Sequence, residues 1–145
     1  HEEVSRAILE FIGSREMAVV EIDTRLEANV TGLRTPAEIE SLIARMDVVL
    51  TTRLHGMVMA LKNGVPAIAV DPHAGGSKVK RQAETIGWPV AFTADAISPR
   101  TLSEALEYCL TPDARQQAAE CAERARGMVE DVQRRFLAAV SRDRS

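Results

Sequence analysis

The chain has 145 residues, the usual size of one domain, and an ordinary globular composition with 46% hydrophobic and 27% charged residues. A net charge of −3 and an aromatic content of 3% argue against a nucleic-acid-binding surface, because such surfaces are basic and often stack bases on aromatic rings. No run of about 18 apolar residues occurs and the N-terminus does not resemble a signal peptide, so neither a transmembrane segment nor a secretion signal is predicted.

Helices and strands are predicted to alternate along the first two thirds of the chain. In chain order, we predict a helix over 2–12, a strand over 17–22, a helix from Pro36, a strand over 47–50, a helix over 54–63, a strand over 66–70, a helix over 77–86 and a strand over 89–92. Thr35 and Glu38 form a capping box at the second helix, and Gly64 and Gly87 each follow the end of a helix.

The last third of the chain is predicted to be helical. One helix begins at Ser98-Pro99 and another at Thr111-Pro112, because proline is favoured in the first turn of a helix. The final helix is long and rich in alanine. Its apolar stripe consists of Ala118, Ala122, Ala125, Val129, Val132, Phe136 and Val140.

The predicted strands are nearly continuous apolar runs rather than alternating ones, which is typical of a parallel sheet covered on both faces. We therefore predict an α/β fold of the Rossmann-like, three-layer α/β/α type with a mostly parallel sheet. A Rossmann-like unit usually begins with a strand, whereas this chain begins with a helix. We therefore expect a strand, and a further domain, upstream of residue 1.

The segment Thr51–Gly56 joins the strand predicted over 47–50 to the next helix. In open parallel sheets, ligands bind beyond the carboxyl ends of the strands, which is where this segment lies. Thr51 and Thr52 are helix-capping residue types, and the unpaired N–H groups at a helix N-terminus attract anions. Arg53 adds a side chain that grips carboxylates and phosphates. The segment therefore predicts an anion site.

The positive charge of this segment supports the same prediction. A cation at a helix N-terminus is unfavourable by roughly 0.3–1 kcal/mol, so stability alone would favour an acidic residue there. Arg53 and His55 are explained if an anion binds between them, and Gly56 and Ala60 leave room for close approach of backbone or ligand. The alternative is that Arg53 is a solvated surface residue and His55 a satisfied, partly buried imidazole.

The stretch 71–82 is a second candidate for anion binding. Asp71 ends the third predicted strand, Ser77 is a capping residue type, and Lys78 and Lys80 bring positive charge to the first turn of the next helix. The alternative is a solvated loop with surface lysines.

Other reactive residues are interpreted as structural. Cys109 and Cys121 lie on apolar faces of predicted helices without metal-ligand spacing, and are read as buried free thiols in a reducing cytosol. His73 is read as a loop residue. Glu21 and Asp23, which follow the first predicted strand, are near enough to reach the site but would oppose an anion there.

Residues 36–90 combine several short motifs in a fixed order. These are an acidic residue before an apolar strand, a Thr-Arg-Leu-His-Gly segment, an apolar helix, Gly-Val-Pro, a second strand, and a lysine ahead of a helix that ends in Ile-Gly. The residues are Asp47, Thr52, Arg53, Leu54, His55, Gly56, Gly64, Val65, Pro66, Lys78 and Gly87. In this order they resemble the C-terminal part of the polysaccharide pyruvyl transferase family.

The resemblance implies that residues 1–145 are the C-terminal Rossmann-like domain of a two-domain, glycosyltransferase-B-like enzyme whose acceptor-binding domain lies upstream. It implies transfer of pyruvate from phosphoenolpyruvate to a sugar of a cell-surface polysaccharide or its lipid-linked precursor, in the cytoplasm or at the inner membrane face. His55 would act as general acid and Arg53 would hold the carboxylate or phosphate of the donor. No metal or other cofactor enters this scheme. The further donor-binding residues would be Thr52, Gly56, Asp71 and Lys78.

Two features leave alternatives open. Many relatives have a shorter, tyrosine-containing loop before the lysine, so Lys78 and Lys80 both remain candidates, although the spacing to Gly87 favours Lys78. The fold also suits half of a nucleotide-sugar glycosyltransferase or epimerase, which usually has a Gly-rich phosphate loop, or a non-catalytic anion-binding module. Without an acceptor-binding domain, the chain alone is not expected to turn over.

Overall fold

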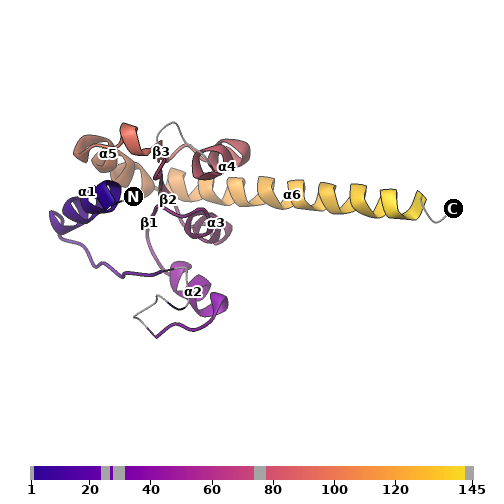
Figure 1. The fold of residues 1–145 in the computed structure, drawn as a ribbon, viewed down its shortest axis with the longest axis horizontal. Coiled ribbons are helices and arrows are strands. Elements are labelled where there is room, and N and C mark those ends of the chain that lie inside the picture. Colours follow the sequence, from indigo (N-terminus) through magenta and orange to yellow (C-terminus); the bar gives the residue numbers. More distant parts are fainter. Residues whose placement is uncertain (1, 24–26, 28–31, 74–77, 143–145) are drawn as a thin grey trace.

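The computed structural model describes residues 2–23, 27, 32–73 and 78–142, and shows a small α/β domain from which one long helix projects (Figure 1). Its elements are α1 (Glu2–Gly13), α2 (Pro36–Ile43), β1 (Val49–Thr51), α3 (Leu54–Lys62), β2 (Ala67–Asp71), α4 (Lys78–Ile86), β3 (Ala91–Thr93), the 3-10 helix η2 (Ala94–Ala96), α5 (Pro99–Cys109) and α6 (Pro112–Arg142).

The three strands form a parallel sheet in the order β1-β2-β3. Helices α3 and α4 lie on one side of the sheet and α1 and α5 on the other (Figure 1), which gives the predicted three-layer arrangement. All five residues of β2 are buried, because β2 is paired on both edges and covered on both faces. Trp88 closes the core by donating its indole N–H to the Ala67 carbonyl oxygen at 2.7 Å. The predicted α/β fold class is therefore confirmed.

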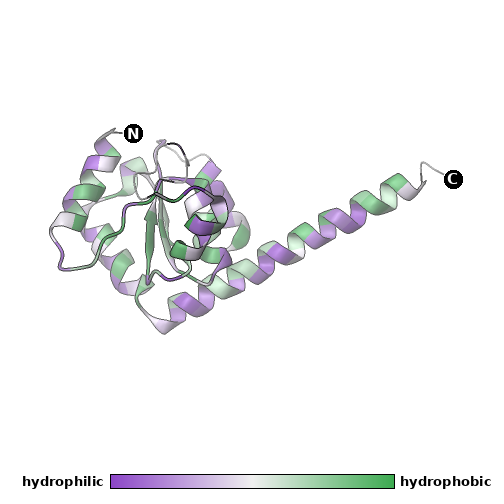
Figure 2. Ribbon diagram, turned by 90° about the horizontal axis from the view of Figure 1, so that it is seen from below, coloured by the Kyte–Doolittle hydropathy of each residue, from purple (hydrophilic) through white to green (hydrophobic). Residues whose placement is uncertain are grey.

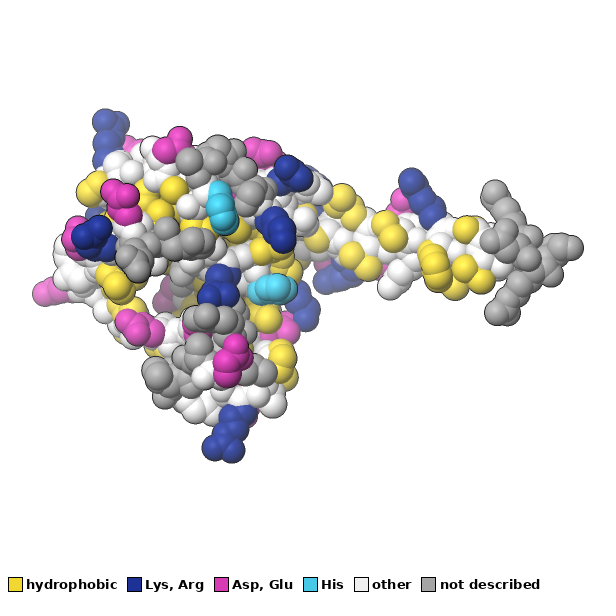
Figure 3. Space-filling model, viewed as in Figure 1, with side chains coloured by type: hydrophobic (Ala, Val, Ile, Leu, Met, Phe, Trp, Pro, Cys, Tyr) yellow, Lys and Arg dark blue, Asp and Glu magenta, His cyan; other side chains and the backbone are white. Residues whose placement is uncertain are grey.

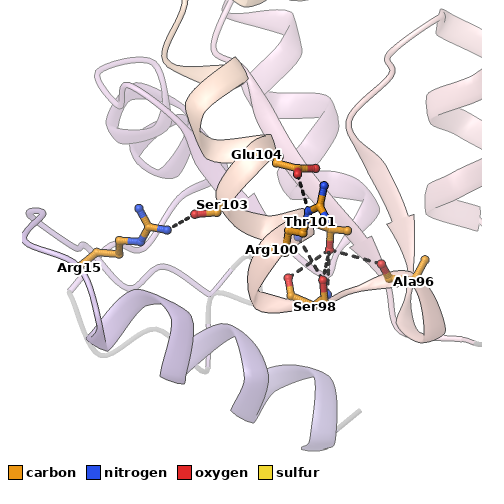
Figure 4. Close-up of polar contacts among 7 residues, drawn as sticks. All are labelled: Arg15, Ala96, Ser98, Arg100, Thr101, Ser103 and Glu104. Carbon is orange, nitrogen blue, oxygen red and sulfur yellow. Dashed lines mark hydrogen bonds and ion pairs between the residues drawn. The ribbon is translucent and has the colours of Figure 1, made fainter.

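The helix starts follow the local capping chemistry. Thr35 caps α2 and Glu38 returns a hydrogen bond to the Thr35 backbone, so the predicted capping box is present. Ser98 caps α5 in the same way with Thr101 (Figure 4). In the same region, Arg15 at the end of α1 donates to the hydroxyl of Ser103 and so ties α1 to α5.

One predicted strand is wrong. Residues 17–22 pass beside β1 in a conformation that is not assigned as a strand, and Met17, Val19 and Val20 are 40%, 48% and 46% exposed. A run of β-branched residues shows that a segment can be extended, but a strand also needs a partner within hydrogen-bonding reach. The other three strands begin one or two residues later than predicted, at Val49, Ala67 and Ala91.

The residues after Thr111 form one continuous helix, α6. The first part of α6 packs onto the core through Ala114, Ala118 and Cys121. The apolar stripe continues along the projecting part of the helix, where its side chains are exposed to solvent (Figure 2). There, the exposed fractions of Val132 and Phe136 are 65% and 66%. None of the helices in the described part of the chain combines the length and apolar character needed to cross a membrane.

The two cysteines are buried and free, as predicted. Burial raises the pKa of Cys109 to about 12 and raises that of Cys121. Both thiols therefore stay protonated and unreactive at neutral pH.

Candidate functional site

The predicted site residues meet at one edge of the sheet. Strands β1 and β2 are parallel neighbours, with Thr51 beside Ala69, so their carboxyl ends lie together. Helices α3 and α4 begin directly beyond those ends and contact each other. Figure 3 shows the two described histidines on the same face of the molecule, with Lys and Arg side chains around them. The topology thus brings the two segments that were predicted to bind anions to one place.

The N-terminus of α3 differs in detail from the prediction. Arg53, rather than Thr51 or Thr52, is the N-cap residue, and its side chain makes no capping hydrogen bond. The Thr51 hydroxyl accepts from the Arg53 backbone N–H at 3.0 Å and donates to the Arg53 carbonyl oxygen at 3.2 Å. This pair of bonds fixes the backbone of Arg53 and leaves the first turn of α3 without a side-chain cap. Such a helix start is suited to an anion.

Gly56 is buried in the first turn of α3, where it faces Thr51. A β-carbon at Gly56 would lie 2.4 Å from the Thr51 hydroxyl oxygen and 3.1 Å from its β-carbon. The space predicted for a ligand or backbone is therefore occupied by the side chain of Thr51. Thr52 is half-buried and His55 is exposed at the start of the helix.

Arg53 has an acidic neighbour. Its Nε atom lies 3.9 Å from a carboxylate oxygen of Asp23, and the two side chains are 44% and 26% exposed. The sequence places Asp23 near enough to reach the site, where an acid is expected to oppose an anion. In the structure, the Asp23 carboxylate stands beside the guanidinium group that was predicted to bind the anion.

Asp71 is the one charged residue among the described residues that is completely buried. Its carboxylate accepts the backbone N–H groups of Val79 and Lys80 at 3.2 and 3.3 Å, and that of His73 at 3.2 Å. The His73 ring nitrogen Nδ1 lies 3.4 Å from the same carboxylate. Asp71 therefore caps α4 from the end of β2 and holds the helix at the sheet edge. No sequence signal revealed this role, because Asp71 lies seven residues before α4.

Replacing Asp71 by alanine is expected to lower the free energy of unfolding by about 1–3 kcal/mol, because the buried N–H groups of Val79 and Lys80 lose their acceptor. Asp71→Asn keeps one acceptor oxygen and should cost less. Urea denaturation measures both variants, and equal stability of Asp71→Ala and the unmodified protein would contradict the capping role.

The structure separates the two candidate lysines. Lys80 donates from Nζ to the Ala91 carbonyl oxygen at 2.9 Å and lies 3.9 Å from Glu84, so its ammonium group ties α4 to β3. Lys78 is the exposed first residue of α4, and no partner of its ammonium group is found among the residues that the structure describes. Ser77, the capping residue type predicted at the start of this helix, lies outside the described residues.

One of three comparisons with known proteins finds a match. Residues 3–73 match the family model for polysaccharide pyruvyl transferase, a family of transferases for the pyruvylation of polysaccharides. The matched segment includes Thr52, Arg53, His55 and Asp71 and ends before Lys78. Searches of curated proteins and of solved structures found no significant match. Within the described residues, no three His, Cys, Asp or Glu side chains cluster as metal ligands. The match over residues 3–73, which carry the candidate site at the start of α3, supports the resemblance of this chain to the polysaccharide pyruvyl transferase family.

Proposed function

We propose that this chain is the C-terminal, donor-binding domain of a pyruvyl transferase that moves pyruvate from phosphoenolpyruvate to a sugar of a cell-surface polysaccharide or its lipid-linked precursor. The observation that carries the proposal is the helix start at α3. Its first turn has no side-chain cap, and Arg53 and His55 stand there at the carboxyl end of β1. Phosphoenolpyruvate is a compact anion with a carboxylate and a phosphate, so it needs several positive or N–H groups close together.

Three side chains are assigned roles in donor binding and chemistry. Arg53 binds the donor's carboxylate or phosphate with charge-assisted hydrogen bonds. Lys78 supplies a second positive charge from the start of α4, and Lys80 is less suited because the Ala91 carbonyl already holds its ammonium group. Thr52 and the first turn of α3 offer further polar contacts. Gly56 and Asp71 contribute by shaping the two helix starts that face the donor.

His55 is the proposed general acid. Protonation of the donor's methylene carbon makes C2 electrophilic, two hydroxyl groups of the sugar bond to C2 and release their protons, and phosphate leaves with the electrons of its C–O bond. The product is a pyruvate ketal. His55 delivers its proton either to the methylene carbon or to the leaving phosphate oxygen.

The acceptor belongs to a second domain in this proposal. Residues 1–145 form the donor half of a glycosyltransferase-B-like pair, and an N-terminal acceptor-binding domain of the same polypeptide packs against the site edge. The enzyme works in the cytoplasm or at the inner membrane face, where lipid-linked precursors are assembled.

The proposal is tested by adding phosphoenolpyruvate and a glycan acceptor to the polypeptide that contains both domains and measuring phosphate release. The 145-residue chain alone is tested for phosphoenolpyruvate binding by calorimetry. Acceptor-dependent phosphate release supports the proposal. Binding of a nucleotide sugar but not phosphoenolpyruvate would instead favour a nucleotide-sugar enzyme, and binding of anions without turnover would favour a non-catalytic module.

Asp23→Asn is expected to lower the KM for phosphoenolpyruvate by about two- to fivefold, because the neutral amide no longer competes with the donor for Arg53. The kcat should stay the same. Glu104→Gln is the matched control, since it removes a similar exposed pairing with Arg100 on α5 and should leave the KM unchanged. A higher KM in Asp23→Asn would show that Asp23 positions Arg53 rather than competing for it.

A further inference from the structure

Among the described residues, strand β1 is paired on one edge only. The Val49 N–H donates to the Pro66 carbonyl oxygen at 3.0 Å, and Val49 and Thr51 pair with Ala67 and Ala69 of β2. Successive residues of a strand direct their peptide groups to opposite sides, so the N–H and C=O groups of Leu50 point away from β2. In the described part of the chain, no backbone hydrogen bond joins Leu50 to the neighbouring segment 17–22.

An apolar groove of about 190 Å³ lies between β1 and residues 17–22. Residues 17–22 and β1 line it, together with side chains of α1, α2 and α5 that include Phe11, Ile43 and Leu106. The apolar side chains of residues 17–22 and β1 in this lining include Met17, Val19, Val20, Ile22, Val49 and Leu50. Met17, Val19 and Val20 are also 40–48% exposed, so the segment that lines the groove leaves apolar area uncovered. Strand β1 therefore has backbone groups without a hydrogen-bond partner among the described residues, and residues 17–22 have apolar side chains that are only partly covered.

An extended peptide is the occupant that both pairs with the backbone of β1 and covers the apolar side chains of the groove. A row of free N–H and C=O groups at a sheet edge is met in register by the backbone of another strand, whereas a helix uses its own backbone groups internally. An apolar strand would also cover the side chains of the groove. Residues 17–22 make no ladder with the sheet, so they can move outward to admit it without breaking strand pairs.

The position of α1 indicates where that strand comes from. In a parallel sheet, consecutive strands are joined by a right-handed crossover that usually runs through a helix on one face of the sheet. Helix α1 covers the same side as α5 and leads into residues 17–22. We propose that the groove between β1 and residues 17–22 is a strand-acceptor site, filled in parallel to β1 by the stretch that immediately precedes α1 in the longer polypeptide. This inference rests on the N-terminal domain proposed above, which would be joined to this one through that strand.

Hydrogen exchange of the Leu50 amide tests the proposal. It is measured in the 145-residue chain and in the longer polypeptide with its natural upstream sequence, both without donor. We expect exchange of Leu50 to be slower by about 100-fold in the longer polypeptide, because its N–H is then hydrogen-bonded in a sheet. The Ala69 amide, which donates to the Val90 carbonyl, is the internal control and should be protected in both.

Two results would overturn the proposal. Equal, fast exchange of Leu50 in both polypeptides would mean that no strand occupies the edge. Strong protection of Leu50 already in the 145-residue chain would mean that residues 17–22 close onto β1 themselves. Phosphate release by the longer polypeptide is a separate measurement, so protection without turnover would reject the proposed function and keep the strand-acceptor site. Turnover without protection of Leu50 would reject the strand-acceptor site and keep the proposed function.

Discussion

Replacing His55 by glutamine is expected to lower the kcat of the proposed two-domain enzyme by about 100- to 10,000-fold, the usual contribution of a general acid. The glutamine side chain can still donate a hydrogen bond, but it cannot deliver a proton to the methylene carbon or the phosphate oxygen. The KM for phosphoenolpyruvate should change little, because in the proposed site Arg53 and Lys78, rather than His55, bind the donor's negative charge. Steady-state phosphate release measures both constants.

His73→Gln is the matched control for this variant. His73 is exposed on the same face and pairs with Asp71, yet no catalytic role is assigned to it. It should keep most of the kcat. A kcat for His55→Gln close to that of the unmodified protein would remove His55 from the chemistry.

Arg53→Ala separates binding from chemistry at the same helix start. Loss of a charge-assisted hydrogen bond of about 1.5–3 kcal/mol corresponds to a roughly 10- to 150-fold lower kcat/KM. Arg81→Ala, an exposed arginine on α4, should leave both constants unchanged. An equal effect of the two arginine variants would mean that only the general positive charge of this face matters.

Gly56→Ala is expected to destabilise the fold by about 1–3 kcal/mol, because the added methyl group collides with the side chain of Thr51. Thr51 must then turn away and give up its two hydrogen bonds to the backbone of Arg53. The variant should therefore lose both stability and donor affinity. Thermal unfolding of the 145-residue chain measures the first effect, at about 2–4 °C for each kcal/mol.

Gly127→Ala is the matched control, since a β-carbon there meets no atom within 4 Å and the residue lies inside α6. It should stabilise the helix by about 0.5–1 kcal/mol. Adding Thr51→Ala to Gly56→Ala removes the atom at 2.4 Å and should restore part of the stability. No rescue by Thr51→Ala would show that the cost arises elsewhere in α3.

The sequence predicts best those features that depend on residues close together in the chain. The capping box of Thr35 and Glu38 and the turn at Gly64, whose φ is +68°, depend only on local chemistry. The placement of Arg53 and His55 followed from one topological rule, that ligands bind beyond the carboxyl ends of parallel strands. The strand predicted over 17–22 was wrong because strand pairing depends on residues far away in the chain.

The parts of the site that the sequence did not reveal depend on contacts across space. Asp71 caps a helix seven residues away, Lys80 reaches the backbone of β3, and Gly56 makes room for Thr51. In each case the residue type alone suggested a contact with a ligand or room for one. Only the three-dimensional arrangement of the helices and strands shows which residue each of these three residues contacts.

Helix α6 has a consequence for how the isolated chain unfolds. Its 31 residues extend over about 46 Å, and its interior contacts end near Ala125. Beyond Gly127 the described part of the helix is held by its own hydrogen bonds and by short-range ion pairs, such as those of Asp131 with Arg134 and Arg135. An isolated helical segment of this length is marginally stable in water. The projecting part should therefore unwind at a lower temperature than the rest of the domain, so that helicity is lost in two stages and the calorimetric and van't Hoff enthalpies of the chain disagree.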